Sequence, residues 1–229
     1  MDSPYILKEN DDYAVVYKPP KMHCAPLNTE EDNTLCAFVR LCGLNSYFLM
    51  HRLDYETNGL VLFAKNEKSY NFFKSAQENG EFYKEYSAIC APTDNKLIEG
   101  FPDYQKDTEE IKVPMIIESY FRPYGPGRKQ VRPVIEYGKK HKEIAKDKGG
   151  FYKTEITNIK DNIVTARIYR GFRHQIRCHL FWIGYPIQND PLYCHTAPAG
   201  NVLALRSHAL FFPDPSNGKQ LEYRIEALE

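Results

Sequence analysis

Short apolar runs, several of them alternating with polar residues, recur along the chain and predict β-strands. The alternation is clearest on either side of the turn signal Lys160-Asp161-Asn162, which separates two predicted strands. The full set of predicted strands comprises residues 13–18, 60–64, 82–91, 113–120, 131–137, 152–159, 163–169, 202–212 and 221–227. Strands therefore dominate the predicted secondary structure.

Helical spacing of apolar residues appears in fewer places. The predicted helices are residues 34–41, 67–77 and 173–183. Asn33 or Thr34 is a suitable N-cap for the first helix, and Asn79-Gly80 ends the second. Because the strands do not alternate regularly with helices, the pattern favours an α+β fold, with a mixed, largely antiparallel β-sheet and flanking helices. We expect residues 1–229 to form one domain.

Composition is that of an ordinary soluble globular protein, since 42% of the 229 residues are hydrophobic and 26% are charged. The sequence has no run of 18 apolar residues, and Met1-Asp2-Ser3-Pro4 lacks the profile of a signal peptide. The six cysteines include no Cys-x-x-Cys pair, which favours buried, reduced thiols over disulfides or a zinc site. We expect a cytoplasmic protein without membrane contact.

Charge is distributed unevenly. The chain has 30 basic and 30 acidic residues, so its net charge favours no particular class of partner. Residues 121–153, however, hold ten basic residues against three acidic ones. Such a segment forms either a basic face for phosphate groups or a lysine-rich solvated loop, and composition leaves both interpretations open.

Asp54 is the first candidate for chemistry. It follows the apolar run Tyr47-Phe48-Leu49-Met50 and precedes the turn Thr57-Asn58-Gly59 before the predicted strand 60–64. A loop held between two core segments is where a rigid scaffold presents a reactive group. Arg52 lies two residues earlier, on the same side of an extended segment, so a salt bridge that pins the turn is the alternative.

A second cluster spans Arg170 to Leu180. If a helix starts here, Arg173 and Arg177 lie one turn apart on one face, with His174 beside Arg177. Two guanidinium groups near a helix start are unfavourable for the helix dipole unless a carboxylate or phosphate lies beside them. An arginine pair exposed on a surface helix explains the pattern equally well.

Six segments follow, in order, the motifs of one known family. They are Lys18-Pro19-Pro20 (K-P-x-G), residues 51–60 (H-R-L-D-x-x-T-S-G-L), residues 84–88 (K-x-Y-x-A), residues 171–180 (G-R-T-H-Q-I-R-x-H-L), residues 184–193 (G-x-P-I-x-G-D-x-x-Y) and residues 203–210 (L-A-L-H-A-x-x-L). The chain thereby resembles the RluA-type pseudouridine synthases from about Tyr13 to Leu228, nearly its whole length.

The resemblance implies an RNA-modifying isomerase that breaks the C1′–N1 bond of a uridine and rejoins the base through C5. Asp54 is implied to carry the chemistry, and Arg177 to form a charge-assisted pair with it. Tyr86 is implied to stack on the base and to take the C5 proton, a duty that needs a lowered pKa or a relay. No metal or other cofactor is implied.

The substrate side follows from the same resemblance. Arg52 is implied to fill the space left by a flipped uridine or to hold its phosphate, and Arg173 and His174 to contact the substrate. The basic segment 121–153 is a candidate for backbone contacts. The implied partner is rRNA or tRNA, not DNA, with no obligatory protein partner for a monomer. We expect no separate N-terminal RNA-binding domain.

The chain departs from the family pattern at several positions. Phe172-Arg173 replaces the usual Arg-Thr, and Tyr55 stands where arginine is common. Asn58 replaces the serine, and residues 138–150 read as a basic insertion. Asn189 stands where the pattern has a glycine, a substitution that suits a positive φ. These changes concern substrate contacts more than chemistry.

Other functions fit the sequence less well. A catalytically silent RNA-binding protein of the same fold conflicts with the presence of Asp54, Tyr86 and Arg177. A kinase catalytic loop is excluded, because the sequence has no glycine-rich phosphate loop. A hydrolase would use Asp54 with Glu56, or a histidine cluster, but the histidines have no pair at metal-ligand spacing. The histidines in question are His174, His179 and His195.

Overall fold

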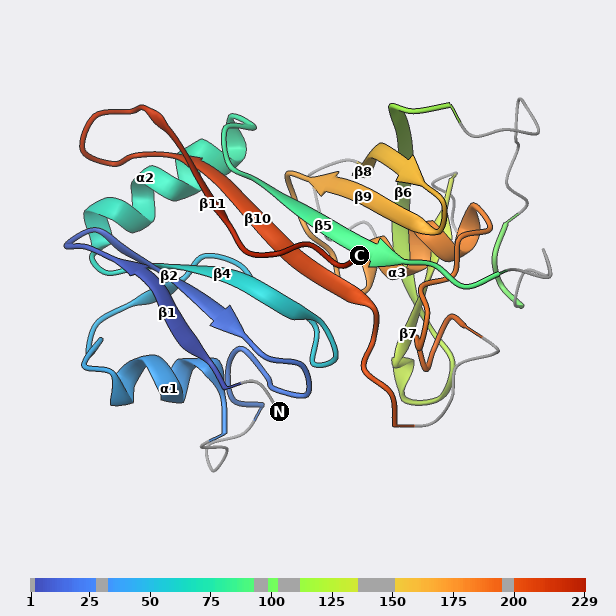
Figure 1. Cartoon of the computed structure of the whole chain (residues 1–229), viewed down its shortest axis with the longest axis horizontal. Coiled ribbons are helices and arrows are strands. Elements are labelled where there is room, and N and C mark those ends of the chain that lie inside the picture. The colour runs from blue at the N-terminus through green and yellow to red at the C-terminus, as the bar shows by residue number, and fades with distance from the viewer. Residues whose placement is uncertain (1–2, 28–32, 93–98, 103–111, 136–150, 195–199) are drawn as a thin grey trace. The chain divides into compact units, whose positions relative to one another are not determined.

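The computed structural model divides the chain into two compact units (Figure 1). It describes residues 3–27, 33–92, 99–102, 112–135, 151–194 and 200–229. The first unit comprises Met1–Ser87 and Leu205–Leu228, and the second comprises Ala88–Ala204 with Glu229. This division leaves open whether the two units act as one catalytic domain over residues 1–229, which stays a prediction.

The first unit is built on a mixed sheet. Its strands are β1 (Tyr5–Glu9), β2 (Tyr13–Lys18), β3 (Phe48–Leu49), β4 (Asn58–Ala64), β5 (Tyr83–Ile89), β10 (Leu205–Pro213) and β11 (Gln220–Arg224). The order is β1-β2-β4-β10-β5, while β3 pairs with β4 and β11 with β10. β4 and β10 run parallel, and β2 and β4 run antiparallel. Strands from both ends of the sequence therefore meet in the middle of this sheet.

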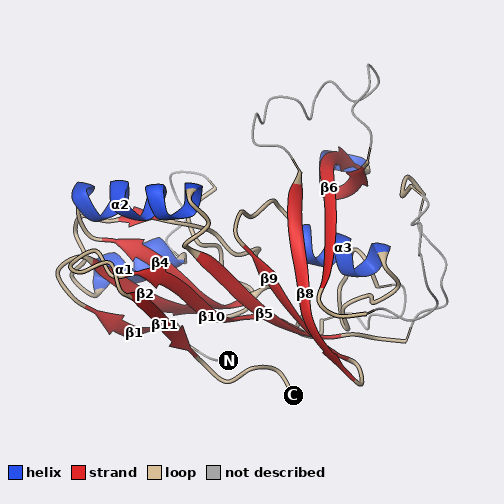
Figure 2. Ribbon diagram, turned by 90° about the horizontal axis from the view of Figure 1, so that it is seen from above, coloured by secondary structure: helices blue, strands red, loops and turns tan. Residues whose placement is uncertain are grey.

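Two helices belong to this unit. α1 (Leu35–Leu41) begins after Thr34, whose hydroxyl accepts a hydrogen bond from the Ala37 amide. α2 (Glu67–Glu78) begins with a capping box formed by Asn66 and Ser69 and ends at Asn79. Figure 2 shows α2 lying along one face of the sheet.

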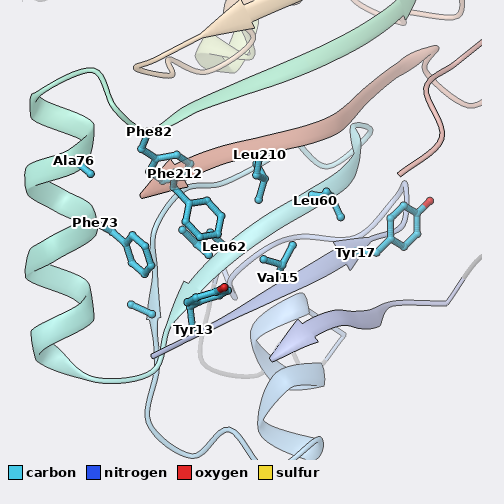
Figure 3. Packing of buried hydrophobic residues seen from close by; sticks show 11 residues of the cluster. Tyr13, Val15, Tyr17, Leu60, Leu62, Phe73, Ala76, Phe82, Leu210 and Phe212 are labelled. Carbon is cyan, nitrogen blue, oxygen red and sulfur yellow. The ribbon is translucent and has the colours of Figure 1, made fainter. Parts of the chain in front are cut away.

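The core of the first unit lies between α2 and the sheet. Phe73 and Ala76 of α2 are buried against Tyr13, Leu62 and Phe212 of the strands (Figure 3). The rings of Tyr13, Phe73 and Phe212 meet edge to face, with centroids 5.3–6.0 Å apart. Such pairs add to the free energy gained from burying aromatic surface, so this core is a rigid base for the loops at the ends of β2 and β4.

The strands of the second unit pair antiparallel with one another. Its strands are β6 (Met115–Tyr124), β7 (Gln130–Val134), β8 (Tyr152–Lys160) and β9 (Ile163–Ile168), with the 3-10 helix η1 (Pro126–Arg128) between β6 and β7. The order is β9-β8-β6-β7. α3 (Gln175–Trp182) contacts β7 and β8. All eight residues of α3 are buried, so the helix has no solvent-exposed face.

Polar side chains fix α3 to the strands. The ring of His179 bonds the hydroxyls of Ser119 and Thr154 at 2.9 and 2.8 Å. Gln175 donates to the Lys153 carbonyl and accepts from the Phe172 amide, both at 2.9 Å. Burial lowers the pKa of His179 to about 3, so its ring is neutral and both of its nitrogens serve the fold.

The α+β prediction is confirmed, and most predicted elements are present. The helix predicted at 173–183 is wrong at its start, because His174 adopts the left-handed region at φ 56 and α3 begins at Gln175. Arg173 therefore precedes the helix and does not share a face with Arg177. β1 and β3 were not predicted, and part of the predicted strand 131–137 lies outside the described residues.

The expectation that the cysteines are buried is confirmed for five of the six. All six cysteines are free thiols, and five are buried while Cys42 is exposed. No helix in the described part of the chain combines the length and apolar character needed to cross a membrane. Across the same described ranges, no group of three His, Cys, Asp or Glu side chains is arranged to hold a metal ion.

Candidate active site

Asp54 lies in the loop that connects β3 to β4, and its side chain is half-buried. Its carbonyl accepts a hydrogen bond from the Thr57 amide at 3.1 Å, which closes the turn predicted from the sequence. Gly59 follows at φ 126, and a Cβ built there would meet the Ser207 carbonyl oxygen at 2.3 Å. Only glycine fits this position, because β4 and β10 approach each other directly beneath the Asp54 loop.

Lys18 is a cation of the first unit that interacts electrostatically with Asp54. Its side chain is fully buried at the end of β2, and its ammonium donates to the carbonyls of Pro19, Met22 and Tyr55 at 2.8, 2.8 and 3.3 Å. Burial lowers the pKa of Lys18 to about 8, while the negative charges of Asp54 and Glu56 oppose this shift. Lys18 thus brings a positive charge to Asp54 and ties β2 to the Asp54 loop.

Cys24 makes a second tie to the same loop. Its buried Sγ accepts a hydrogen bond from the Leu53 amide at 3.2 Å and donates to the Leu53 carbonyl at 3.5 Å. Burial raises the pKa of the Cys24 thiol, so the sulfur keeps the proton that it donates. Both backbone groups of the residue before Asp54 are therefore held by one side chain.

Tyr86 lies on β5 and is buried, with 5% of its surface exposed. Burial raises the pKa of its phenol well above the ordinary value, a hydrogen bond with Ser207 opposes the rise, and the charge of Asp54 adds to it. Tyr86 and Asp54 are thus close enough to interact electrostatically. The raised pKa also means that Tyr86 is a neutral phenol near pH 7, so it accepts a proton only through a relay.

His51 and Arg52, the first residues of the motif, differ in environment. His51 is half-buried, and its Nε2 accepts a hydrogen bond from the Leu62 amide at 3.2 Å. Burial lowers the pKa of His51 well below its usual value, so its ring is neutral and supports the loop. Arg52 is exposed, as a residue implied to contact RNA requires.

Arg177 belongs to the second unit, where it forms a buried bidentate ion pair. Its Nε and Nη2 lie 2.7 and 2.8 Å from the two carboxylate oxygens of Asp190. The Asp190 carboxylate also accepts the amides of Leu192 and Tyr193 at 2.9 and 3.2 Å. Asn189, directly before it, has φ 63, the positive value that its place in the motif predicted.

Arg173 and His174 lie before α3. Arg173 is exposed, and its guanidinium donates to the carbonyls of Arg128 and Gln130 at 2.6 and 3.3 Å. These bonds fix it to the hairpin between β6 and β7. His174 is half-buried, and its Nδ1 lies 3.3 Å from the Tyr193 hydroxyl oxygen.

The predicted site residues therefore divide between the units. Asp54, Tyr86 and Arg52 belong to the first, and Arg173, His174 and Arg177 to the second. The pairing of Arg177 with Asp54 stays a prediction. Of the basic segment 121–153, residues 136–150 lie outside the described residues, as does His195.

Three further residues next to Asp54 were not predicted as site residues: Lys18, Cys24 and Ser207. The motif that contains Lys18 was a usable signal for this residue, because a lysine at the end of a strand and before two prolines is unusual. Ser207 lies in the motif at residues 203–210, which gave no sign of its contact with Tyr86, and no local pattern in the sequence marks Cys24. Their roles depend on contacts with distant segments.

Comparison with known proteins identifies the family. The RNA pseudouridylate synthase family matches residues 12–182. RNA pseudouridine synthase 7 of Arabidopsis thaliana is 29% identical over 198 residues, which cover 84% of this chain and 45% of the relative. Ribosomal large subunit pseudouridine synthase D of Zymomonas mobilis is 25% identical over 241 residues, which cover 96% of this chain and 68% of the relative. A Caenorhabditis elegans relative is 30% identical over 189 residues, which cover 82% of this chain and 38% of the relative. This chain therefore spans less than half the length of several curated relatives.

A solved structure agrees on the fold. Human RNA Pseudouridylate Synthase Domain Containing 1 aligns with a TM-score of 0.67 at 18% identity, covering 98% of this chain and 83% of that one. With a family match over residues 12–182 and an Asp54 loop that carries the family's motif, this chain belongs to the RluA-type family of RNA pseudouridine synthases.

Proposed function

We propose that this protein is an RNA pseudouridine synthase that isomerises a specific uridine of rRNA or tRNA, with Asp54 as its catalytic carboxylate. The observation that carries the proposal is the setting of Asp54, on a loop tied to Lys18 and Cys24 and in electrostatic contact with Tyr86. A catalytic carboxylate needs this kind of preorganised support.

The reaction rearranges bonds without an external reactant. The C1′–N1 bond of the uridine breaks, a C1′–C5 bond forms, and the proton displaced from C5 is balanced by one gained at N1. Asp54 starts this sequence, either as a nucleophile toward the ribose or base or by removing a ribose proton. Each of these roles uses the ionised carboxylate, next to which Lys18 supplies a positive charge.

Tyr86 serves the reacting base in two ways. Its ring supplies a flat, buried surface for stacking beside Asp54. Its hydroxyl shares a hydrogen bond with Ser207, so a proton leaving C5 has a route through that pair that does not require a phenolate. This arrangement replaces the lowered tyrosine pKa that a direct general base would need.

The target uridine must leave its stack in the RNA to reach Asp54. Flipping a nucleotide costs a few kcal/mol, which contacts with the protein must offset. The exposed guanidinium of Arg52 lies two residues from Asp54, where it can fill the space that the base leaves or bind its phosphate. Arg173 and His174 of the second unit are further candidates for RNA contacts.

The test is a transcriptome-wide map of pseudouridine in cells that lack the gene, complemented with the wild-type chain or with Asp54→Asn. We expect at least one rRNA or tRNA uridine to be modified by the wild type and not by Asp54→Asn. Loss of the site on deletion with recovery by Asp54→Asn would instead identify a silent RNA-binding protein. A map that is the same in all strains would refute both functions.

A further inference from the structure

Tyr55, the residue after Asp54, has an exposed aromatic ring. With 42% of its surface exposed, it is one of the large hydrophobic residues that the fold leaves in solvent. The motif of this family commonly has arginine at this position, so the ring is a feature of this chain. The exposed part of this ring, next to the proposed catalytic carboxylate, is open to a ligand.

The ring is held in position. It lies against the imidazole of His23, with ring centroids 4.6 Å apart and an angle of 40° between the planes. The backbone on either side is fixed, because Lys18 donates to the Tyr55 carbonyl and Cys24 bonds both backbone groups of Leu53. A ring ordered in this way loses little conformational entropy when a ligand stacks on it.

The class of ligand follows from the two tyrosines near Asp54. Tyr86 is 5% exposed and is the ring placed for the reacting base, which must leave water, whereas Tyr55 remains in solvent. An exposed ring one residue from Asp54 is within reach of a nucleotide that neighbours the target uridine. Stacking of a base on such a ring depends little on base identity, because every base has a flat face.

We infer that Tyr55, supported by His23, forms a stacking shelf for the nucleobase adjacent to the flipped uridine. This inference rests on the proposed synthase activity and adds a binding subsite to it. The Tyr55 ring stacks on the neighbouring base, whereas an arginine at this position would bind a phosphate. It therefore favours RNA whose flanking nucleotide is unpaired and free to stack.

The test measures kcat/KM of the full chain on an RNA oligonucleotide that carries the mapped uridine, and on two copies with an abasic nucleotide directly 5′ or 3′ of it. Tyr55→Ala is expected to lower kcat/KM on the intact RNA by roughly 5- to 150-fold, mainly through KM. On the RNA that lacks the stacked base, Tyr55→Ala and the wild type are expected to have equal kcat/KM. Tyr55→Phe keeps the ring and the wild-type value.

Controls separate stacking from folding. Tyr55→Leu fills space against His23 without a flat face and is expected to behave like Tyr55→Ala. Phe48 is a matched exposed ring that lies tilted against Tyr70, with ring centroids 4.8 Å apart, and Phe48→Ala is expected to leave kcat/KM unchanged. An equal loss for Tyr55→Ala on intact and abasic RNA, or no loss at all, overturns the shelf. If the wild-type chain does not modify the mapped uridine, the proposed synthase function fails instead, and the shelf with it.

Discussion

Lys18 in the first unit and Arg177 in the second are both buried cations, and the fold holds them in opposite ways. Arg177 is 2% exposed and meets the fully buried Asp190 through two short hydrogen bonds. Lys18 is fully buried, but its ammonium donates to three backbone carbonyls. A guanidinium matches a carboxylate in a planar, bidentate pair, whereas an ammonium is a compact charge that carbonyls can surround.

The difference indicates a structural role for Arg177 and a role beside Asp54 for Lys18. The charge of Arg177 is balanced by Asp190, which in turn holds the backbone at residues 190–193, so this pair defines the shape of the second unit. The ammonium of Lys18 donates to backbone carbonyls, and its positive charge acts on Asp54. Lys18 is thus a candidate for a charge that acts on Asp54, the proposed catalytic carboxylate.

Removing Arg177 tests the structural side of this comparison and should have the largest effect. Arg177→Met leaves Asp190 buried without its partner, so we expect a loss of about 3–5 kcal/mol in the free energy of unfolding. Urea denaturation followed by the fluorescence of Trp182, on the same helix, measures it. Arg177→Met with Asp190→Leu should lose less than Arg177→Met alone, and the exposed control Arg173→Met should change little. An Arg177→Met loss below about 1 kcal/mol would contradict a structural role.

The pH dependence of activity tests the chemical side. A lysine with a pKa of about 8 is charged below that pH and neutral above it, so the charge beside Asp54 disappears as the pH rises. We expect kcat to fall about tenfold per pH unit above roughly pH 8. Lys18→Arg, which stays charged, should move this decline to higher pH.

Lys84 is the necessary control, because burial also lowers its pKa to about 8. Lys84→Arg should leave the decline of kcat where the wild type has it. If Lys84→Arg moves the decline and Lys18→Arg does not, the charge that matters is on Lys84.

The smallest effect is expected from removing the hydrogen bonds between Cys24 and the Asp54 loop. Cys24→Ala removes two hydrogen bonds to Leu53, for an expected loss of about 1 kcal/mol in stability and a lower kcat at unchanged KM. Cys24→Ser should restore part of kcat, since its hydroxyl can bond the same groups. The exposed Cys42→Ala should match the wild type in both measurements, and equal kcat in Cys24→Ala would show that the tie does not position Asp54.

Much of this fold could be predicted because the relevant signals are local. Thr34 was readable as the cap of α1, the predicted start of the second helix at residue 67 matches α2, and the turn at residues 160–162 separates β8 from β9 as expected. β1 could not be found, because its residues are largely exposed and carry no alternation. The start of α3 was misplaced because the left-handed backbone of His174 has no sequence signature of its own.

The candidate site was predictable to a smaller extent. Motif order pointed to Asp54, Tyr86 and Arg177, but not to what each side chain contacts. Arg177 pairs with Asp190, which comes from a later segment of the chain. Tyr86 bonds with Ser207, which comes from another strand. A single sequence carries no record of such contacts, since they depend on the packing of the whole unit.

The parallel pairing of β4 with β10 has a consequence for synthesis on the ribosome. Ser207 bonds Leu60, 147 residues earlier, and the close approach at Gly59 needs both strands in place. A nascent chain that has exposed the Asp54 motif therefore lacks the strand beneath it until residues 205–213 leave the exit tunnel. Closing so long a loop is slow, so the first unit completes its sheet only after the second unit has been translated.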